Sequence, residues 1–297
     1  MSLDRLCLLM AAPHLMQIAN KMKKPIENLA IIAGRGQIPS MILEKCHKEG
    51  IKYRLFLLSG ERYEDESIYD SFNPIKLKYG EISKFLQIVK QEGIENLIMA
   101  GGVTKPDFKA IKVDGKSALL MGKILAKKIL GDESVLDTVI KFFEKEGLNI
   151  VKIQDFLENI ISQRGVFSSC NPSKDDLENI KIAKDAINHF SKFDVGQSLI
   201  VAQKQIIAIE AVEGTDKMIR RCKDLDIKYK DSAILVKMSK KNQSDKADLP
   251  TIGVETVQNC IESGIKGIAI QAKLTLVLEK EKVVDLANKN GVFIVVV

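Results

Sequence analysis

The chain has 297 residues, enough for two domains of ordinary size, and 45% of them are hydrophobic, which is sufficient for full apolar cores. No apolar run approaches the roughly 20 residues of a membrane-spanning helix, so an integral membrane protein is not expected. The net charge of +6 suits an anionic small molecule or membrane surface, and with no Trp and 5% aromatic residues there is no platform for nucleic acid.

The cysteines are five in number and widely spaced, and no pair has the spacing of a metal site or a redox motif. We therefore expect a reduced, cytoplasmic protein. The three histidines also lie far apart in the sequence, which argues against a histidine-based zinc site and against a Ser-His-Asp triad.

Residues 28–165 alternate between strand and helix patterns, which indicates an α/β domain with a Rossmann-like parallel sheet. The expected elements are a strand and glycine turn over 28–39, strands at 53–60, 96–103 and 149–153, and helices at 40–49, 81–91, 117–147 (two helices, broken near Gly131) and 155–165. The motif Gly34-x-Gly36 before a helix start can aim backbone N–H groups at an anion. Because the third glycine of a dinucleotide fingerprint is missing, it can equally be a tight connection. Residues 1–27 are interpreted as an N-terminal extension.

Residues 166–297 are expected to form a second, mixed α/β domain. Its expected elements are helices at 177–193, 217–225, 256–264 and 282–291, and strands at 198–203, 205–212, 233–237, 267–272, 274–279 and 292–297. The first two strands are separated by a short polar turn, which predicts a hairpin.

Three polar stretches in this half are candidate sites, because loops on a rigid scaffold often carry chemistry. They are DVGQ (194–197), EGTD (213–216) and KMSKKNQSDKADLPTIG (237–253). In the last, lysines can bind phosphate oxygens, while Asp245 and Asp248 can bind a divalent cation or position a water.

Each stretch also has a simpler interpretation. DVGQ can be a turn, and 237–253 can be a solvated surface loop. Thr215 or Asp216 is a natural N-cap for the helix that follows, and for Asp216 capping is the preferred reading, with Arg220 as its partner one turn later.

The three stretches occur in this order behind an IAGRG opening at 32–36, and as a set they resemble the LpxI family. The members of this family are metal-dependent UDP-2,3-diacylglucosamine pyrophosphatases of lipid A biosynthesis, and they are unrelated to the calcineurin-like phosphoesterases. The resemblance spans 28–297 and includes MAGGVTKPDF (99–108) and GDESVLDTVIKFFEKEG (131–147). It implies a Rossmann-like N-terminal domain, a C-terminal α/β domain and a substrate in the cleft between them.

The implied reaction is attack of water on the α-phosphate of UDP-2,3-diacylglucosamine, which gives UMP and 2,3-diacylglucosamine 1-phosphate (lipid X) and requires a divalent cation, Mg²⁺. The resemblance places the catalytic aspartate of the DLP motif at Asp248. Candidate metal ligands are Glu213, Asp216 and Asp245. The expected substrate contacts are Gly34, Gly36, Gln37, Gly101, Gly102, Asp194, Gln197, Thr215, Lys237, Gln243 and Lys246.

The chain departs from the family pattern at several positions. Ser244 follows the glutamine where an acidic residue is common, and Lys246 stands where an arginine is common. Lysine keeps the charge but loses the bidentate fork of arginine. Arg35 occupies the middle of the opening glycine triplet, and a late Ala-Gly pair reads Ala272-Lys273.

Two other functions stay open at this point. One is a non-catalytic protein that binds a nucleotide sugar or a lipid. The other is a Rossmann oxidoreductase, against which stand the missing third glycine and the lack of a clear acidic ribose partner, although Glu61 lies just past the second strand. A homodimer and a peripheral contact with the inner membrane are also left open.

Overall fold

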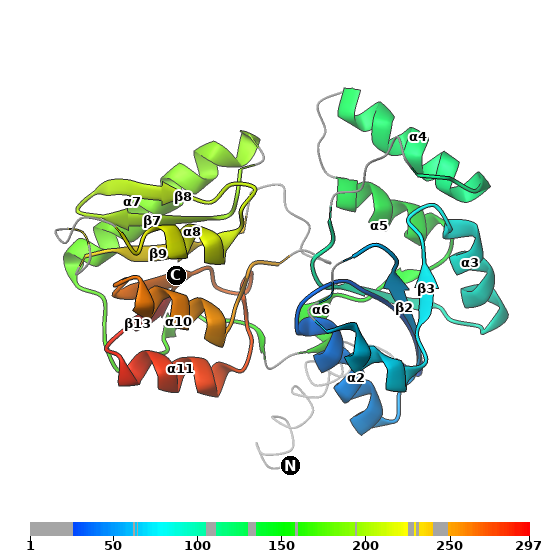
Figure 1. Ribbon diagram of the computed structural model, residues 1–297, viewed down its shortest axis with the longest axis horizontal. Helices are drawn as coiled ribbons and strands as arrows, with labels where there is room; N and C mark the ends of the chain where they lie inside the picture. The colour runs from blue at the N-terminus through cyan, green and yellow to red at the C-terminus, as the bar shows by residue number, and fades with distance from the viewer. Residues whose placement is uncertain are drawn as a thin grey trace, which may run out of the picture.

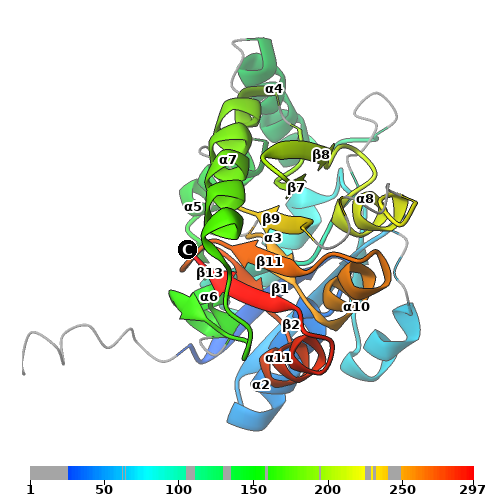
Figure 2. The same ribbon diagram turned by 90° about the vertical axis from the view of Figure 1, so that its left-hand side faces the viewer.

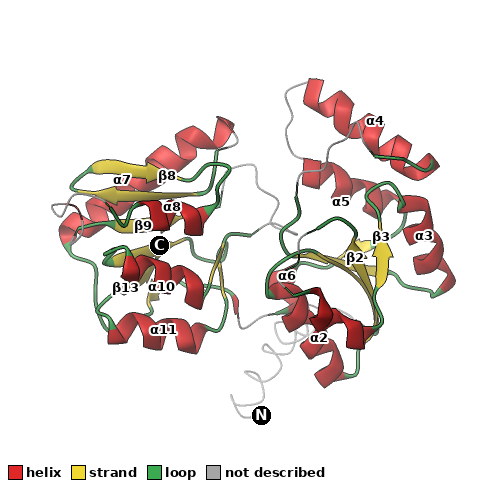
Figure 3. Ribbon diagram, in the orientation of Figure 1, coloured by secondary structure: helices red, strands yellow, loops and turns green. Residues whose placement is uncertain are grey.

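A computed structural model of the chain describes residues 26–61, 63, 65–104, 111–129, 135–157, 160–193, 195–224, 229, 232–239 and 249–297. These residues form two α/β domains that lie side by side (Figure 1). In each domain helices pack on a central sheet (Figure 3).

The N-terminal domain is built on a parallel sheet, which within the described residues has five strands in the order β3-β2-β1-β4-β5. The strands are β1 (Asn28–Ala33), β2 (Lys52–Leu58), β3 (Ile75–Leu77), β4 (Asn96–Ala100) and β5 (Asn149–Ile150). β1 and β4 are nearly continuous apolar runs, as expected for strands buried on both faces. The order confirms the predicted Rossmann-like sheet.

Helices cover both faces of this sheet. One face packs against α2 (Ile38–Glu49), the 3₁₀ helix η1 (Glu66–Phe72) and α6 (Ile153–Phe156). The other packs against α3 (Ile82–Gln91), α4 (Gly115–Ile129) and α5 (Val135–Lys145). Successive residues of β1 alternate between the two cores, as the two-residue period of a strand requires.

Two sequence-based predictions for this domain are wrong. The short edge strand β3 lies in a stretch where no strand was expected, and it is recognisable only through its pairing with β2. The helix expected over 155–165 ends at Phe156. After it, the N–H of Ser162 donates to Thr275 O (3.1 Å) and Gly165 begins a strand, so tertiary pairing overrides local helix propensity.

The C-terminal domain has a mixed sheet, which within the described residues runs in the order β6-β13-β11-β9-β7-β8. The strands are β6 (Gly165–Val166), β7 (Ser198–Ala202), β8 (Gln205–Ile209), β9 (Ile234–Lys237), β11 (Gly267–Ile270) and β13 (Phe293–Val296). β9, β11 and β13 are parallel, whereas β6, β7 and β8 are antiparallel to their neighbours. The predicted hairpin is confirmed: Gln203 and Lys204 both have positive φ (50° and 63°), as in a type I′ turn.

The helices of this domain also lie on two sides of their sheet (Figure 2). α7 (Lys174–Phe190) packs on one face, and α8 (Thr215–Arg221), α10 (Val254–Glu262) and α11 (Lys280–Lys289) pack on the other. α7 begins three residues before the expected position, because Ser173 and Asp176 form a capping box. For α8 the predicted N-cap is wrong: Gly214 caps the helix, and Thr215 is its first residue.

Three segments, 160–162, 249–252 and 273–278, meet between the two domains, and we call them the domain junction. Strands β10 (Thr251–Ile252) and β12 (Leu276–Val277) pair within it, and Lys273 N–H donates to Ser162 O (2.7 Å). The strand predicted over 274–279 is therefore confined to two residues.

Apolar side chains of the junction join the core of the N-terminal domain. Leu249, Leu276 and Leu278 are buried in the same cluster as Leu29 and Ile31 of β1. The two domains therefore share one continuous packed region at this point. None of the helices in the described part of the chain is both long enough and apolar enough to cross a membrane.

Candidate functional site

A buried polar chain of four side chains lies at one edge of the C-terminal sheet. Lys237, the last residue of β9, donates from Nζ to Thr215 Oγ1 (2.9 Å), and Thr215 Oγ1 donates to Glu210 Oε1 (3.0 Å). Ser198 Oγ lies 3.1 Å from Thr215 Oγ1. Because a hydroxyl has one proton, Thr215 donates to Glu210 and accepts from Lys237 and Ser198. All four residues are at least nine-tenths buried.

The sheet topology explains why these residues meet. β7 is antiparallel to β9, and Ser198 at its start is paired with Lys237 at the end of β9. Gly214 turns the chain with φ of 84° and lets α8 begin at Thr215 above the same edge. The cluster thus contains Thr215 from EGTD and Lys237 from the start of 237–253, and Ser198 directly follows the third stretch, DVGQ.

A close contact explains why the third residue of DVGQ, Gly196, is a glycine. A Cβ at Gly196 would lie 2.3 Å from Glu210 Cγ, so only glycine lets the Glu210 side chain cross this strand. Glu210 Oε2 then accepts from the Gln197 N–H (3.0 Å). Glu210 belongs to the same acidic run, 210–216, as the predicted ligands Glu213 and Asp216. That run indicates a possible metal or water site, but Glu210 was not in the final set of predicted ligands or substrate contacts.

Gln197, beside this cluster, has a side-chain acceptor that no described residue satisfies. Its backbone O accepts from Met238 N–H (2.9 Å), which ties DVGQ to the residue after β9. Its side-chain Oε1 is buried and has no hydrogen-bond partner among the described residues. A buried carbonyl without a donor is a costly arrangement unless another group, from the chain or from a ligand, supplies one.

The predicted metal ligands do not come together in the described part of the chain. Glu213 forms an ion pair with Arg221 (3.4 Å), and Asp216 accepts from Asn259 Nδ2 (3.2 Å). Arg220 pairs with Glu255 (3.5 Å) and contacts Asp216 only through its backbone O. No group of three or more acidic, His or Cys side chains suited to a metal is found among the described residues. These residues do not by themselves fit Mg²⁺.

Five predicted site residues lie outside the described residues. They are Asp194, Gln243, Asp245, Lys246 and the predicted catalytic residue Asp248. The described chain stops at Ser239, whose N–H donates to Gln271 Oε1 (2.9 Å), and resumes at Leu249 in the domain junction. Ser239 is thus held near the carboxyl ends of β9 and β11, whereas Leu249 is held in the domain junction.

In the N-terminal domain, the loops after β1 and β4 lie against each other. Gly34 N–H donates to Ala100 O (2.7 Å), and Arg35 and Gly102 exchange two backbone hydrogen bonds (2.8 and 2.9 Å). A Cβ on Gly34 would lie 2.5 Å from Gly102 O. Gly34 therefore serves close backbone packing, and its N–H is not available to an anion.

Of the remaining predicted residues of this edge, Gly101 is packed against the main chain of Arg35, whereas Gly36 and Gly102 are more open. A Cβ added at Gly36 would meet nothing within 4 Å, and one at Gly102 would meet only the Arg35 side chain at 3.9 Å. Gln37 is the N-cap residue of α2 but makes no side-chain capping bond. The Gln37 side chain therefore does not satisfy the free backbone N–H groups in the first turn of α2.

A buried carboxylate that the sequence analysis did not include among the site residues lies at the same edge. Glu61 accepts from Thr104 N–H (2.8 Å), Thr104 Oγ1 (2.9 Å) and the Tyr79 hydroxyl, and Arg35 Nε is 3.4 Å away. Burial alone would raise the pKa of Glu61, but these hydrogen bonds and the arginine outweigh it and hold the pKa below its usual value. Glu61 is therefore ionised at neutral pH.

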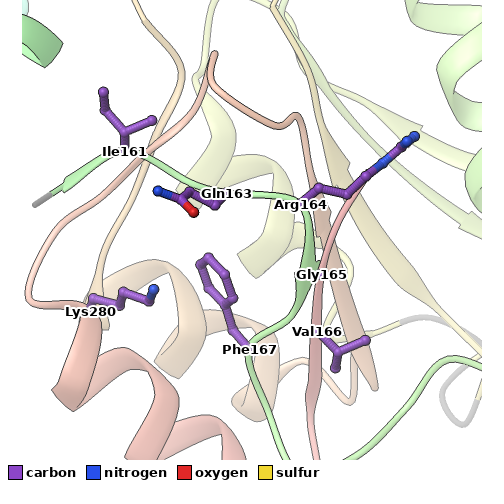
Figure 4. A pocket seen from close by; sticks show the side chains of 7 residues that line it. All are labelled: Ile161, Gln163, Arg164, Gly165, Val166, Phe167 and Lys280. Atoms are coloured by element: carbon purple, nitrogen blue, oxygen red, sulfur yellow. The ribbon is translucent and has the colours of Figure 1, made fainter. Parts of the chain in front are cut away.

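A separate cavity of about 450 Å³ lies beside the junction (Figure 4). It is lined by Ile161, Gln163, Arg164, Gly165, Val166, Phe167 and Lys280. Lys280 Nζ lies 3.9 Å from the centre of the Phe167 ring, whereas Arg164 points away from them. Since no predicted site residue lines this cavity, it is distinct from the polar cluster.

The fold and the two polar sheet edges define a class: a two-domain α/β protein, with a Rossmann-like domain joined to a mixed-sheet domain that carries a buried lysine–threonine–glutamate chain. The chain belongs to the LpxI family. Residues 28–160 match the LpxI N-terminal domain and residues 163–295 match the LpxI C-terminal domain. It is also 30% identical, over 91% of its length and 97% of the relative's, to the UDP-2,3-diacylglucosamine pyrophosphatase LpxI of Caulobacter vibrioides.

Proposed function

We propose that the protein hydrolyses UDP-2,3-diacylglucosamine in lipid A biosynthesis, by attack of water on the α-phosphate, with UMP and 2,3-diacylglucosamine 1-phosphate as products. The observation that carries this proposal is the relationship to the Caulobacter pyrophosphatase over nearly the full length of both chains. The division 28–165 and 166–297 is proposed as the two-domain frame of the enzyme.

Asp248 is proposed as the carboxylate that positions the attacking water. Leu249, the next residue in the sequence, is buried at the domain junction. This supports binding of the substrate between the domains. Gly36, Gln37, Gly101 and Gly102 are the proposed contacts from the first domain.

Charge on the diphosphate must be offset as it grows in the transition state. Lys237 is the last residue of β9. With Lys246, Gln243, Gln197, Thr215 and Asp194 it forms the proposed set of contacts from the second domain. The Thr215 hydroxyl and Glu210 fix the position of the Lys237 ammonium. Its place in a hydrogen-bonded chain favours orientation of the charge over free movement.

Mg²⁺ is proposed as the cofactor, and when bound it would neutralise charge on the diphosphate oxygens. Glu213 and Asp216 would need to leave their present partners to serve as ligands. Asp245 is the third proposed ligand. A peripheral contact of the protein with the inner membrane, where the acyl chains of the substrate reside, is part of the same proposal.

The test is release of UMP from UDP-2,3-diacylglucosamine with Mg²⁺ and with excess EDTA, for the wild type and the variants Asp248→Asn and Asp285→Asn. Asp285 is an exposed aspartate of α11 and serves as the control. We expect turnover that requires Mg²⁺ and falls about 100- to 10,000-fold in Asp248→Asn alone. Full activity of Asp248→Asn would move the essential carboxylate to Asp245 or Asp216. Binding of substrate without turnover by the wild type would favour a non-catalytic binding protein.

A further inference from the structure

Arg35 and Glu61 form an ion pair with an unusual geometry at the carboxyl edge of the N-terminal sheet. Arg35 follows β1 and Glu61 follows β2, and Nε lies 3.4 Å from Glu61 Oε2. The Glu61 side chain is fully buried, whereas 41% of the Arg35 side chain is exposed. The pair therefore has a buried anionic side and an open cationic side.

The carboxylate does not depend on this arginine for its hydrogen bonds. Tyr79 and Thr104 supply three donors to Glu61. As a result, the buried Nε of Arg35 has no hydrogen-bond partner among the described residues. The attraction between the two charges fixes the direction of the guanidinium without using up its donors.

The same chain contains a contrasting pair of the ordinary structural kind. Arg54 and Glu92 make two parallel hydrogen bonds, from Nε to Oε2 (3.0 Å) and from Nη2 to Oε1 (2.7 Å). There the fork of the arginine is matched by both carboxylate oxygens. At Arg35 the guanidinium is held by the charge of Glu61 but makes no such pair of hydrogen bonds within the described part of the chain, which is the arrangement expected of a residue that awaits a ligand.

The surroundings of Arg35 are rigid and open at the same time. Two backbone hydrogen bonds with Gly102 lock its main chain. A Cβ at Gly36 would meet nothing, and one at Gly102 would lie 3.9 Å from Arg35 Nη2. Glycine at 36 and 102 thus places no Cβ on the main chain beside the Arg35 side chain.

We propose that Arg35 binds the diphosphate of the substrate and that Glu61 is the positioning residue that aims it. This inference rests on the proposed function for the identity of the anion. A planar guanidinium recognises two oxygens of a phosphate, which a lysine cannot do in the same geometry. Glu61 makes no contact with the substrate; it sets the orientation of the arginine.

The experiment measures the affinity for UDP and for uridine by titration calorimetry, together with KM and kcat for UDP-2,3-diacylglucosamine. The variants are Arg35→Gln, Arg35→Lys and Glu61→Gln, with Arg54→Gln as the matched control. Loss of a hydrogen bond to a charged group predicts that Arg35→Gln weakens UDP about ten- to hundredfold. We expect KM to rise by a similar factor, with uridine affinity and kcat little changed. For UDP affinity, Arg35→Lys should recover part of the loss seen in Arg35→Gln. Glu61→Gln should have an affinity between those of the wild type and Arg35→Gln, and Arg54→Gln should match the wild type.

Unchanged UDP affinity in Arg35→Gln, or equal losses for UDP and uridine, would overturn the inference and leave the proposed hydrolase standing. A wild-type protein that does not hydrolyse the substrate but loses UDP affinity in Arg35→Gln would overturn the proposed function alone. If Arg35→Gln does not fold, as judged by circular dichroism, the charge-conserving Arg35→Lys decides, because full UDP affinity in that variant contradicts a bidentate contact.

Discussion

Thr215 shows how one hydroxyl can hold two buried charges together. Its Oγ1 accepts from the Lys237 ammonium and donates to the Glu210 carboxylate, so neither charge meets the other directly. Burying a charge is costly unless it is hydrogen-bonded, and the hydroxyl gives each of the two charges one hydrogen bond. The residue is thus as important for folding as for the position of the lysine.

Replacing Thr215 with valine keeps the shape but removes the hydroxyl. We expect the free energy of unfolding to fall by about 2–4 kcal/mol, because the Lys237 ammonium and the Glu210 carboxylate each lose one hydrogen bond at a buried site. Urea denaturation at pH 7 measures this, with Thr256→Val as control, since that buried threonine of α10 lies outside the cluster. Equal losses in the two variants would show that the bridge adds nothing.

At the scale of elements, the loops after β1 and β4 are in close backbone contact. Gly101 has φ of 92°, and a Cβ there would lie 2.5 Å from Arg35 O. Its neighbour Gly102 has no such restriction. Close packing thus requires glycine at position 101, whereas the next position, 102, has room for a side chain.

Gly101→Ala should lower the free energy of unfolding by about 2–4 kcal/mol, since both backbone strain and a clash with main-chain atoms result. Gly102→Ala should cost less than about 1 kcal/mol. Chemical denaturation of the two variants in parallel measures the difference. A Gly101→Ala protein as stable as Gly102→Ala would contradict the packing role.

The capping box of α7 makes a pH-dependent contribution. Burial would raise the pKa of Asp176, but Lys266 (2.9 Å) and Ser173 outweigh it and lower the pKa below its usual value. The folded state therefore binds the proton less readily than the unfolded state, and the stabilisation is present above the unfolded pKa of about 4 and lost as the pH falls through the folded pKa.

Asp176→Asn should accordingly cost about 2 kcal/mol at pH 7, and the difference from the wild type should shrink below about pH 4. Thermal unfolding monitored by circular dichroism between pH 3 and 7 measures this. Asp175→Asn, in the same turn but exposed, is the control and should change stability by less than about 0.5 kcal/mol. A constant difference at every pH would exclude the carboxylate charge as the cause.

At the scale of the whole molecule, the domain junction holds the two domains together through packing and hydrogen bonds. Leu276 belongs to the C-terminal half of the chain but is 1% exposed and packs with β1 of the N-terminal domain. Segments more than 100 residues apart, at Ser162 and Lys273, are hydrogen-bonded there as well. The relative position of the two polar edges depends on these contacts.

Leu276→Ala should remove about 2–5 kcal/mol of stability, because it leaves a cavity in packing shared by both domains. Differential scanning calorimetry should show a lower transition temperature, and exposed Leu119 on α4 provides the control Leu119→Ala. A variant with an unchanged transition would show that the domains do not depend on this contact.

The sequence by itself determined the elements with strong local patterns. The continuous apolar runs of β1, β4 and β9 and the short polar turn between β7 and β8 are visible within windows of five to ten residues. The ordered set of polar motifs that marks the family is also visible in the sequence. Local periodicity and turn chemistry suffice for such features.

Only the tertiary structure decided which polar groups become partners. Glu61 meets Thr104 across 43 residues and Thr215 meets Lys237 across 22, and the segment after Phe156 turns away from helix because of bonds to 273–275. The energy of these contacts comes from burial, where an unpaired polar group is expensive and a paired one is not. Burial is a property of the packed sheets and helices, and so no short window of sequence contains it.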